Sequence, residues 1–320
     1  MSEREELVYK IAVQHYLQGE TMEAIARRFS VSRSTVSRLL KDARDLGYVH
    51  ITLYPPEGSF NKLSSWFSNH YGVCTHIVPV PVGSTEKRRL DIVAAMGADI
   101  ISQTVQPNDV IGIAWGNTVN TVSQHLKKQR VAGIEIVQLN GSANSTTYGI
   151  PHSSEILERF GSTFGARVHH FPVPAFFDYP ETRTQLWKET SVQHIRNLHR
   201  RCTTAVFGVG ALKASTPSMV YSGGFLSSAD MATIRDENAV GDICTVILRA
   251  DGSWDLALNE RASGPTPPEL QRISRRFCIA AGAGRIEAIL AALRAQVATD
   301  LIIDEDTAMR LKDYAQREHI

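Results

Sequence analysis

The sequence predicts a two-domain α/β protein, with a small helix-turn-helix domain over residues 1–54 and a larger, mainly parallel α/β sheet domain over residues 55–320. Three observations lead to this fold class. The 320-residue chain is several times longer than one helix-turn-helix, and residues 21–51 show the pattern of two short helices around a tight turn. Beyond residue 55, short apolar runs alternate with amphipathic helices, which is typical of a parallel sheet covered on both faces.

The N-terminal domain is expected to contain three helices and a short strand. The helices are predicted at residues 3–17, 22–29 and 33–46. Ser32 can cap the third helix through its hydroxyl, and Ser30 stands in the turn where glycine is common. Residues 49–53 alternate as a wing strand would, and the Pro-Pro-Glu-Gly segment at 55–58 is interpreted as a linker. The small apolar core between the helices is expected to consist of Ile25, Ala26, Phe29, Val31, Val36, Leu39 and Leu40.

Polar and cationic residues gather on the outer face of the third helix. They are Arg33, Ser34, Thr35, Ser37, Arg38 and Lys41. Residues 27–44 carry six basic side chains and one acidic one, a local charge of +5, although the whole chain carries only +1. Such a patch suits phosphate contacts, and serine, threonine and arginine can reach base edges. Double-stranded operator DNA is therefore the expected partner; the alternative is a solvated helical hairpin in an ordinary α domain.

The second domain is expected to alternate strands and helices to its end. The predicted strands cover residues 76–82, 110–114, 134–139, 167–173, 204–209, 243–248, 276–281 and 300–303. The predicted helices cover residues 60–71, 87–104, 118–128, 154–164, 182–198, 227–238, 269–274, 285–295 and 305–314.

In open α/β sheets, ligands bind where strands end and helices begin. Four such junctions are rich in small residues, at 115–118, 138–142, 207–211 and 279–285. Helix-start amides and Arg285 can hold an anionic group, whereas amide and carboxylate side chains can orient hydroxyl groups. The expected effector-binding residues are Gly116, Asn117, Thr118, Gln138, Asn140, Asp242, Gly282 and Arg285. Two alternatives to ligand binding stay open. The loop at 115–118 could be a tight strand-to-helix turn with Thr118 as its cap, and Asp242 could belong to a capped turn.

Several classes of protein lack support. The sequence has no Walker motif, HExxH or GxSxG, and the glycines near residue 282 lack the GxGxxG spacing. The four cysteines are far apart, with no CxxC pair and no histidine beside them at metal-ligand spacing, so buried thiols are expected, without disulfides, metal or cofactor. No long apolar run or apolar leader appears, so we expect a cytoplasmic protein without a membrane partner.

The order of the motifs resembles the SorC family of bacterial sugar-responsive regulators over nearly the full length. The matching segments are residues 26–40, 112–118, 208–210, 240–243, 281–285 and 301–308. The resemblance implies an effector domain similar to the ribose-5-phosphate isomerase and glucosamine-6-phosphate deaminase fold. The family's loops that match residues 115–118 and 282–285 hold a phosphorylated sugar, and its members assemble as tetramers built from dimers. The family often has Ser or Thr in place of Asn117 and Lys in place of Arg285.

Two functions follow from these observations. The first is a transcriptional regulator, a dimer or tetramer, whose operator binding is controlled by a sugar, polyol or sugar phosphate in the C-terminal domain. The alternative is a sugar-phosphate isomerase or deaminase with an accessory DNA-binding domain. Such an enzyme needs a carboxylate base and a partner acid. Asp242 is a candidate base, but no paired carboxylate motif is evident.

Overall fold

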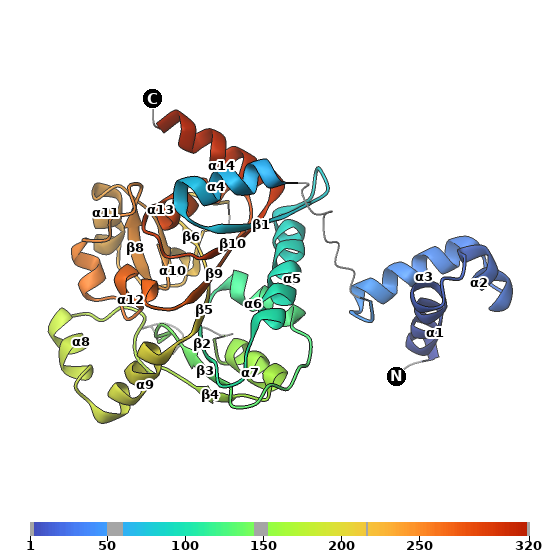
Figure 1. Cartoon of the computed structure of the whole chain (residues 1–320), viewed down its shortest axis with the longest axis horizontal. Helices are drawn as coiled ribbons and strands as arrows, with labels where there is room; N and C mark the ends of the chain where they lie inside the picture. The colour runs from blue at the N-terminus through green and yellow to red at the C-terminus, as the bar shows by residue number, and fades with distance from the viewer. Residues whose placement is uncertain (1–2, 50–59, 144–152, 216, 319–320) are drawn as a thin grey trace. The chain divides into compact units, whose positions relative to one another are not determined.

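The computed structural model describes residues 3–49, 60–143, 153–215 and 217–318 (Figure 1). The chain divides into two compact units, Met1–Tyr54 and Pro55–Ile320. Of the predicted wing strand only Val49 belongs to the described residues, and the predicted linker at 55–58 lies outside them.

The first unit consists of short helices around a small apolar core. They are α1 (Glu3–Ala12), a π-helical turn (Val13–Leu17), α2 (Met22–Arg28) and α3 (Arg33–Asp45). The single helix expected over residues 3–17 is thus an α-helix that continues as a π turn. Ser32 Oγ accepts a hydrogen bond from Thr35 N at 3.0 Å and caps α3, as predicted. Ser30 adopts a φ of +55°, the left-handed conformation in which glycine is common. The core is formed by Val8, Ile11, Ala12, Ile25, Ala26, Val36, Leu39, Leu40 and Ala43.

The second unit is built on a seven-stranded sheet in the order β1-β10-β9-β5-β2-β3-β4, in which every neighbouring pair is parallel. The predicted α/β class is therefore confirmed. The strands are β1 (Cys74–Val78), β2 (Val110–Ile113), β3 (Glu135–Gln138), β4 (Arg167–His169), β5 (Thr204–Gly208), β9 (Arg275–Ala280) and β10 (Asp300–Asp304). The helices are α4 (Asn61–Tyr71), α5 (Glu86–Thr104), α6 (Asn117–His125), α7 (Ser153–Phe164), α8 (Pro180–Leu186), α9 (Thr190–Arg201), α10 (Met219–Ser222), α11 (Ser228–Asp236), α12 (Pro267–Gln271), α13 (Ile286–Arg294) and α14 (Glu305–Glu318).

Successive strand residues point to opposite faces and enter two separate cores. In β9, Phe277 and Ile279 join one core, whereas Cys278 and Ala280 join the other. Helices α5, α6 and α7 supply the first core, and α4, α9, α13 and α14 supply the second (Figure 1). Because both faces are covered, the strands read as continuous apolar runs, which explains why the sequence pattern located most of them.

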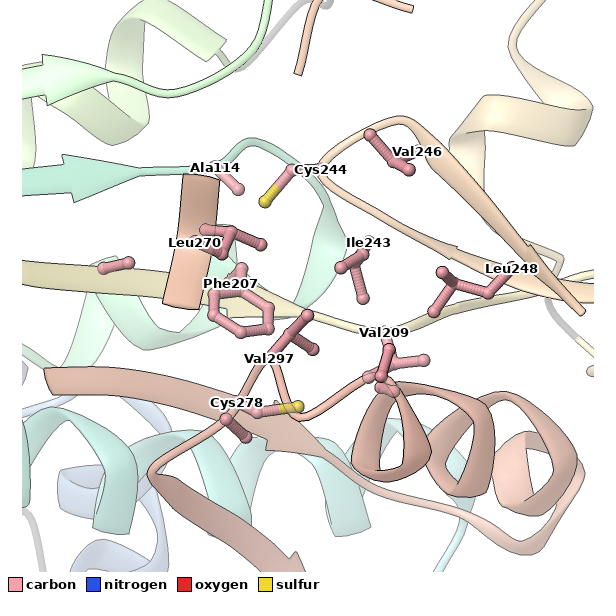
Figure 2. Close-up of a cluster of buried hydrophobic side chains, with 14 of the residues drawn as sticks. Ala114, Phe207, Val209, Ile243, Cys244, Val246, Leu248, Leu270, Cys278 and Val297 are labelled. Atoms are coloured by element: carbon pink, nitrogen blue, oxygen red, sulfur yellow. The ribbon is translucent and has the colours of Figure 1, made fainter. Parts of the chain in front are cut away.

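A second, three-stranded antiparallel sheet corrects the prediction of one strand at residues 243–248. It contains β6 (Gly210–Ala211), β7 (Ala239–Ile243) and β8 (Val246–Arg249) in that order. Cys244 and Thr245 form the two-residue turn of the β7–β8 hairpin, with φ of +48° and +73°. Positive φ at both positions is the usual geometry of such a turn, but Asn-Gly normally signals it. The apolar run through Cys244 therefore hides the turn. Figure 2 shows Ile243, Cys244 and Val246 of this run in the same buried cluster as Phe207 and Val209.

The single helix predicted over residues 182–198 is also wrong, because α8 and α9 are separate helices. Trp187 follows α8. The guanidinium carbon of Arg183, on α8, and that of Arg196, on α9, each lie 5.2 Å from the centroid of the Trp187 ring. The Gln193 side chain donates a hydrogen bond to the Trp187 carbonyl at 2.7 Å. Trp187 and its contacts thus lie at the break between two helices that the sequence pattern joins into one.

The cysteines are free thiols, and Cys202, Cys244 and Cys278 are buried as expected. Cys74, the first residue of β1, is exposed, so the expectation of a buried thiol is wrong at this position. It lies at the amino end of an edge strand, where apolar neighbours in sequence do not imply burial.

Candidate functional site

The predicted DNA-binding residues of the first unit lie on α3. Arg33, Ser34, Ser37, Arg38 and Lys41 are exposed, and the separation of an apolar inner face from a polar outer face is as expected for a recognition helix. Thr35 differs from the others, because its side chain is half-buried and its hydroxyl lies 2.8 Å from Ser32 Oγ.

The cations of this face are not equivalent. Arg33 Nε lies 2.6 Å from Glu23 Oε1, so part of its charge is neutralised within the helix pair. Arg38 and Lys41 make no salt bridge to any described residue, and both are exposed. Their charge is therefore the more available to phosphate or to a base edge.

A pocket opens at the carboxyl ends of the central strands of the large sheet. Including its open mouth it has a volume of ≈ 560 Å³. The loop after β2, the end of β5, α10 and the β7–β8 turn supply most of its wall. It is lined by Ala114, Trp115, Gly116, Asn117, Thr118, Val119, Asn140, Gly208, Val209, Gly210, Pro217, Ser218, Met219, Val220, Asp242, Cys244, Thr245 and Arg285.

The start of α6 forms one wall. Gly116 has a φ of +141°, and no side chain caps the helix. The first intrahelical bond runs from Asn120 N to the Gly116 carbonyl at 2.9 Å, so the amides of the preceding turn have no partner within the helix. Trp115 fixes this loop, since its indole donates to the Gly141 carbonyl at 2.8 Å and its ring stacks on Phe225.

Asn140 and Asp242, two residues of the pocket lining, each have a buried side-chain oxygen without a hydrogen-bond partner among the described residues. Asn140 is 1% exposed and Asp242 is 5% exposed, and the Oδ1 atom of each has no hydrogen-bond partner among the described residues. Burial raises the pKa of Asp242 to about 6, although the polar groups of Ser218, Thr245 and Tyr221 act to lower it. An unsatisfied buried acceptor is unfavourable, so both oxygens are suited to hydroxyl donors of a ligand.

Arg285 is the cation of the pocket. It ends the 3-10 turn Ala283–Arg285, directly before α13, and its Nη1 donates to the Ala281 carbonyl at 3.4 Å. Burial lowers its pKa, but a guanidinium stays charged at physiological pH. Six of the predicted effector residues thus line one pocket: Gly116, Asn117, Thr118, Asn140, Asp242 and Arg285.

The structure places Gln138 and Gly282 outside the pocket lining. The Gln138 amide donates to the Asn140 carbonyl at 2.8 Å and accepts from Phe171 N at 3.1 Å. Gly282 N donates to Asp304 Oδ2 at 3.1 Å and to Thr307 Oγ1 at 3.0 Å, and its φ of +96° favours glycine. Both residues therefore hold a lining residue or loop in position.

Sequence reasoning missed Ser218, Thr245 and Gly210 as parts of the pocket. A signal existed for Gly210, which belongs to a glycine-rich strand end. A Cβ at this position would lie 1.9 Å from Asp242 Oδ1 and 2.6 Å from Ser218 Oγ, so only glycine fits. Ser218 had no recognisable motif, and Thr245 lies in the unrecognised turn.

Comparisons with known proteins find matches for both units of the chain. A family model described as "Putative sugar-binding domain" matches residues 55–311, and a homeodomain-like domain model matches residues 2–49. The deoxyribonucleoside regulator of Bacillus subtilis (strain 168) is 28% identical over 97% of this chain and 98% of its own length. The sorbitol operon regulator of Klebsiella pneumoniae is 23% identical over 94% of this chain and 96% of its own length.

Solved structures show the same fold. A domain of a possible sugar-binding transcriptional regulator from Arthrobacter aurescens TC1 is 43% identical, with a TM-score of 0.74, over 81% of this chain and 99% of that one. The full-length sorbitol operon regulator SorC from K. pneumoniae has a TM-score of 0.72 at 23% identity, over 97% and 99% of the two chains.

Together, the helix-turn-helix unit, the match to a sugar-binding domain and the regulators among the relatives show that this is a sugar-responsive, DNA-binding transcriptional regulator. The chain belongs to the SorC family of these regulators. None of the helices in the described part of the chain has the length and apolar character to cross a membrane.

Replacing Asp242 with Asn is expected to stabilise the ligand-free protein at neutral pH and to have little effect at acidic pH. Burial raises the pKa from 3.8 to about 6, so the folded state binds this proton more tightly, and ionisation destabilises the fold as the pH rises through that range. A shift of roughly two units corresponds to ~3 kcal/mol, so we expect urea unfolding at about pH 7.5 to show a gain of ~1–3 kcal/mol. At about pH 4 the gain in the free energy of unfolding should disappear. An equal gain at about pH 4 and about pH 7.5 would contradict a raised pKa at Asp242.

Proposed function

We propose that this regulator senses a polyhydroxylated ligand with an anionic group, such as a sugar phosphate, in the pocket at the carboxyl ends of the sheet. One observation carries the proposal: Asn140 and Asp242, each with a buried oxygen that lacks a partner among the described residues, line the same pocket as Arg285 and the start of α6. Hydroxyl groups would donate to the two oxygens, while the guanidinium and the helix amides would bind the anion.

The effector acts by binding, without turnover, in this proposal. Asp242 is the only carboxylate among the described residues of the pocket lining, and isomerase or deaminase chemistry needs a base with a partner acid. The relatives named above are regulators, which supports the same view. A regulator of DNA would act in the cytoplasm of a bacterium.

To control transcription, the effector must bind the DNA-competent and DNA-incompetent states with different affinities. Arg285 sits between the pocket and α13, and α13 in turn packs on β7 and α14. A ligand that draws Arg285 toward its anionic group can therefore act on the second unit's helical layer as well as on the pocket itself.

Arg285→Ala is expected to weaken binding of a phosphorylated sugar far more than that of its unphosphorylated form, because it removes the cation that would pair with phosphate. A loss of roughly 1.5–3 kcal/mol, about 10- to 150-fold, is typical of a charged hydrogen bond. Calorimetric titration of both forms, chosen from a thermal-shift screen of sugars, polyols and their phosphates, measures it.

Lys213→Ala provides the matched control, since Lys213 pairs with Glu287 at 3.3 Å and does not line the pocket. Equal and slight losses for both ligand forms would show that Arg285 is not an anion clamp. The effector would then be a neutral sugar or polyol.

We propose that α3 makes the operator contacts through Arg33, Ser34, Thr35, Ser37, Arg38 and Lys41, with Arg38 the most important cation. Arg38→Ala is expected to weaken binding by ~1–3 kcal/mol, because a base or phosphate contact is lost. Gel-shift titration on DNA selected from a random pool by the wild-type protein measures this loss. Lys10→Ala, which removes an exposed cation of α1 paired with Glu6 at 2.7 Å, should leave affinity unchanged. Equal affinity of Arg38→Ala and wild type would remove Arg38 from the interface.

We propose that the working form is a dimer or tetramer. One small helix-turn-helix reads a single half-site, and useful operator affinity requires two. The large α/β unit is the expected source of the contact, with α4 as a second candidate. Light scattering at micromolar concentration should give a mass of two or four chains, and a strict monomer with and without DNA would refute the proposal.

A further inference from the structure

The exposed thiol of Cys74 belongs to a cluster of three chemically different side chains. Cys74 and His76 lie on β1, two residues apart and so on the same face of the strand. Asp300 begins the neighbouring strand β10 and is the register partner of Cys74. One potential ligand atom of each residue lies within 4.8 Å of the other two.

The contacts within the cluster converge on a single atom. Cys74 Sγ lies 3.8 Å from His76 Nε2, and Asp300 Oδ1 lies 3.1 Å from the same nitrogen. A catalytic Cys–His–Asp relay needs the thiol on one ring nitrogen and the carboxylate on the other. The arrangement therefore does not form such a relay, but it places a sulfur, a nitrogen and an oxygen around one point.

The sulfur–nitrogen and nitrogen–oxygen separations fit the coordination sphere of a small divalent cation. With zinc–ligand distances of about 2.3 Å to sulfur and about 2.0–2.1 Å to nitrogen and oxygen, tetrahedral geometry places sulfur and nitrogen ~3.5 Å apart and nitrogen and oxygen ~3.3 Å apart. The observed 3.8 Å and 3.1 Å differ from these values by only a few tenths of an ångström. Thiolate, imidazole and carboxylate are also the three ligand types that zinc uses in proteins.

One further contact orients the carboxylate. Thr299 Oγ1 donates to Asp300 Oδ2 at 2.8 Å, which leaves Oδ1 directed at His76. Metal-binding carboxylates are commonly held by such hydrogen bonds, and loss of the supporting group weakens metal binding.

We propose that Cys74, His76 and Asp300 form a binding site for a thiophilic divalent cation, Zn²⁺ by its ligand set, with the fourth position open to solvent. The site joins the edge strand β1 to β10 at their amino ends. The effector pocket lies at the carboxyl ends of the parallel strands, whereas this cluster lies at the amino ends. The ion would act on this domain's stability, because it cross-links the strand that follows α4 to the rest of the sheet.

Cobalt(II) titration of the full-length protein tests the proposal with a spectroscopic probe. Wild type should show thiolate-to-cobalt charge-transfer absorption and the visible bands of a tetrahedral ion, both reversed by Zn²⁺. Cys74→Ser should lose the charge-transfer band, and His76→Ala and Asp300→Asn should each weaken Zn²⁺ binding at least about tenfold in a competition with a chelating dye. His125→Ala is the control: His125 Nε2 lies 2.8 Å from Asp91 Oδ1, in a His–Asp pair outside the cluster, and this variant should bind Zn²⁺ as wild type does.

Alkylation of the native protein locates the site independently. Cys74 is the exposed cysteine, so iodoacetamide should modify it first, and one equivalent of Zn²⁺ should slow this modification at least about tenfold. Mass spectrometry of the Cys74 peptide reads the result in the folded protein, without relying on a variant. Unchanged alkylation with Zn²⁺, or charge-transfer absorption that persists in Cys74→Ser, would overturn the proposal.

Discussion

The common direction of the seven strands in the large sheet is the constraint on which the rest of this protein depends. Because every neighbouring pair is parallel, the carboxyl ends of all the strands lie on the same side of the sheet, and the loops that follow them are gathered there. Residues as distant in sequence as Asn117, Asn140 and Arg285 share one pocket for this reason. The small antiparallel sheet then closes the pocket by adding Asp242 and the turn at Thr245.

The same edge concentrates polar groups that the fold itself does not satisfy. The start of α6 has no side-chain cap, and Asn140 Oδ1 and Asp242 Oδ1 have no hydrogen-bond partner among the described residues. The Asp242 carboxylate also leaves no room for a Cβ at Gly210. A protein selected for stability alone would cap the helix and remove the buried carboxylate. The proposed effector, with its hydroxyls and anionic group, would satisfy these groups together.

Much of this could be predicted from sequence, because buried parallel strands read as apolar runs and strand ends as small residues. The predicted fold class and family are confirmed, and six predicted effector residues meet in one cavity. The prediction missed the turn at Cys244 because its residues give no turn signal. It also missed the break near Trp187, where the contacts of the ring with Arg183 and Arg196 are visible only in the folded chain. Ser218 and the cluster around His76 depend on elements far apart in the chain, so only their pairing in space reveals them.

In the proposed function, binding of the effector at the buried carboxylate of Asp242 would also change the lifetime of the regulator. Without a ligand, its ionised form is held in a poorly solvated position, which favours the unfolded chain at neutral pH. A ligand that binds only the folded chain, present at about 100 times its Kd, stabilises the folded state by roughly 2.7 kcal/mol and so lowers the unfolded fraction about a hundredfold. Proteases that degrade unfolded chains would then remove the regulator more slowly when effector is abundant. The sugar signal would thus set how many copies of the protein the cell holds, in addition to what each copy does on DNA.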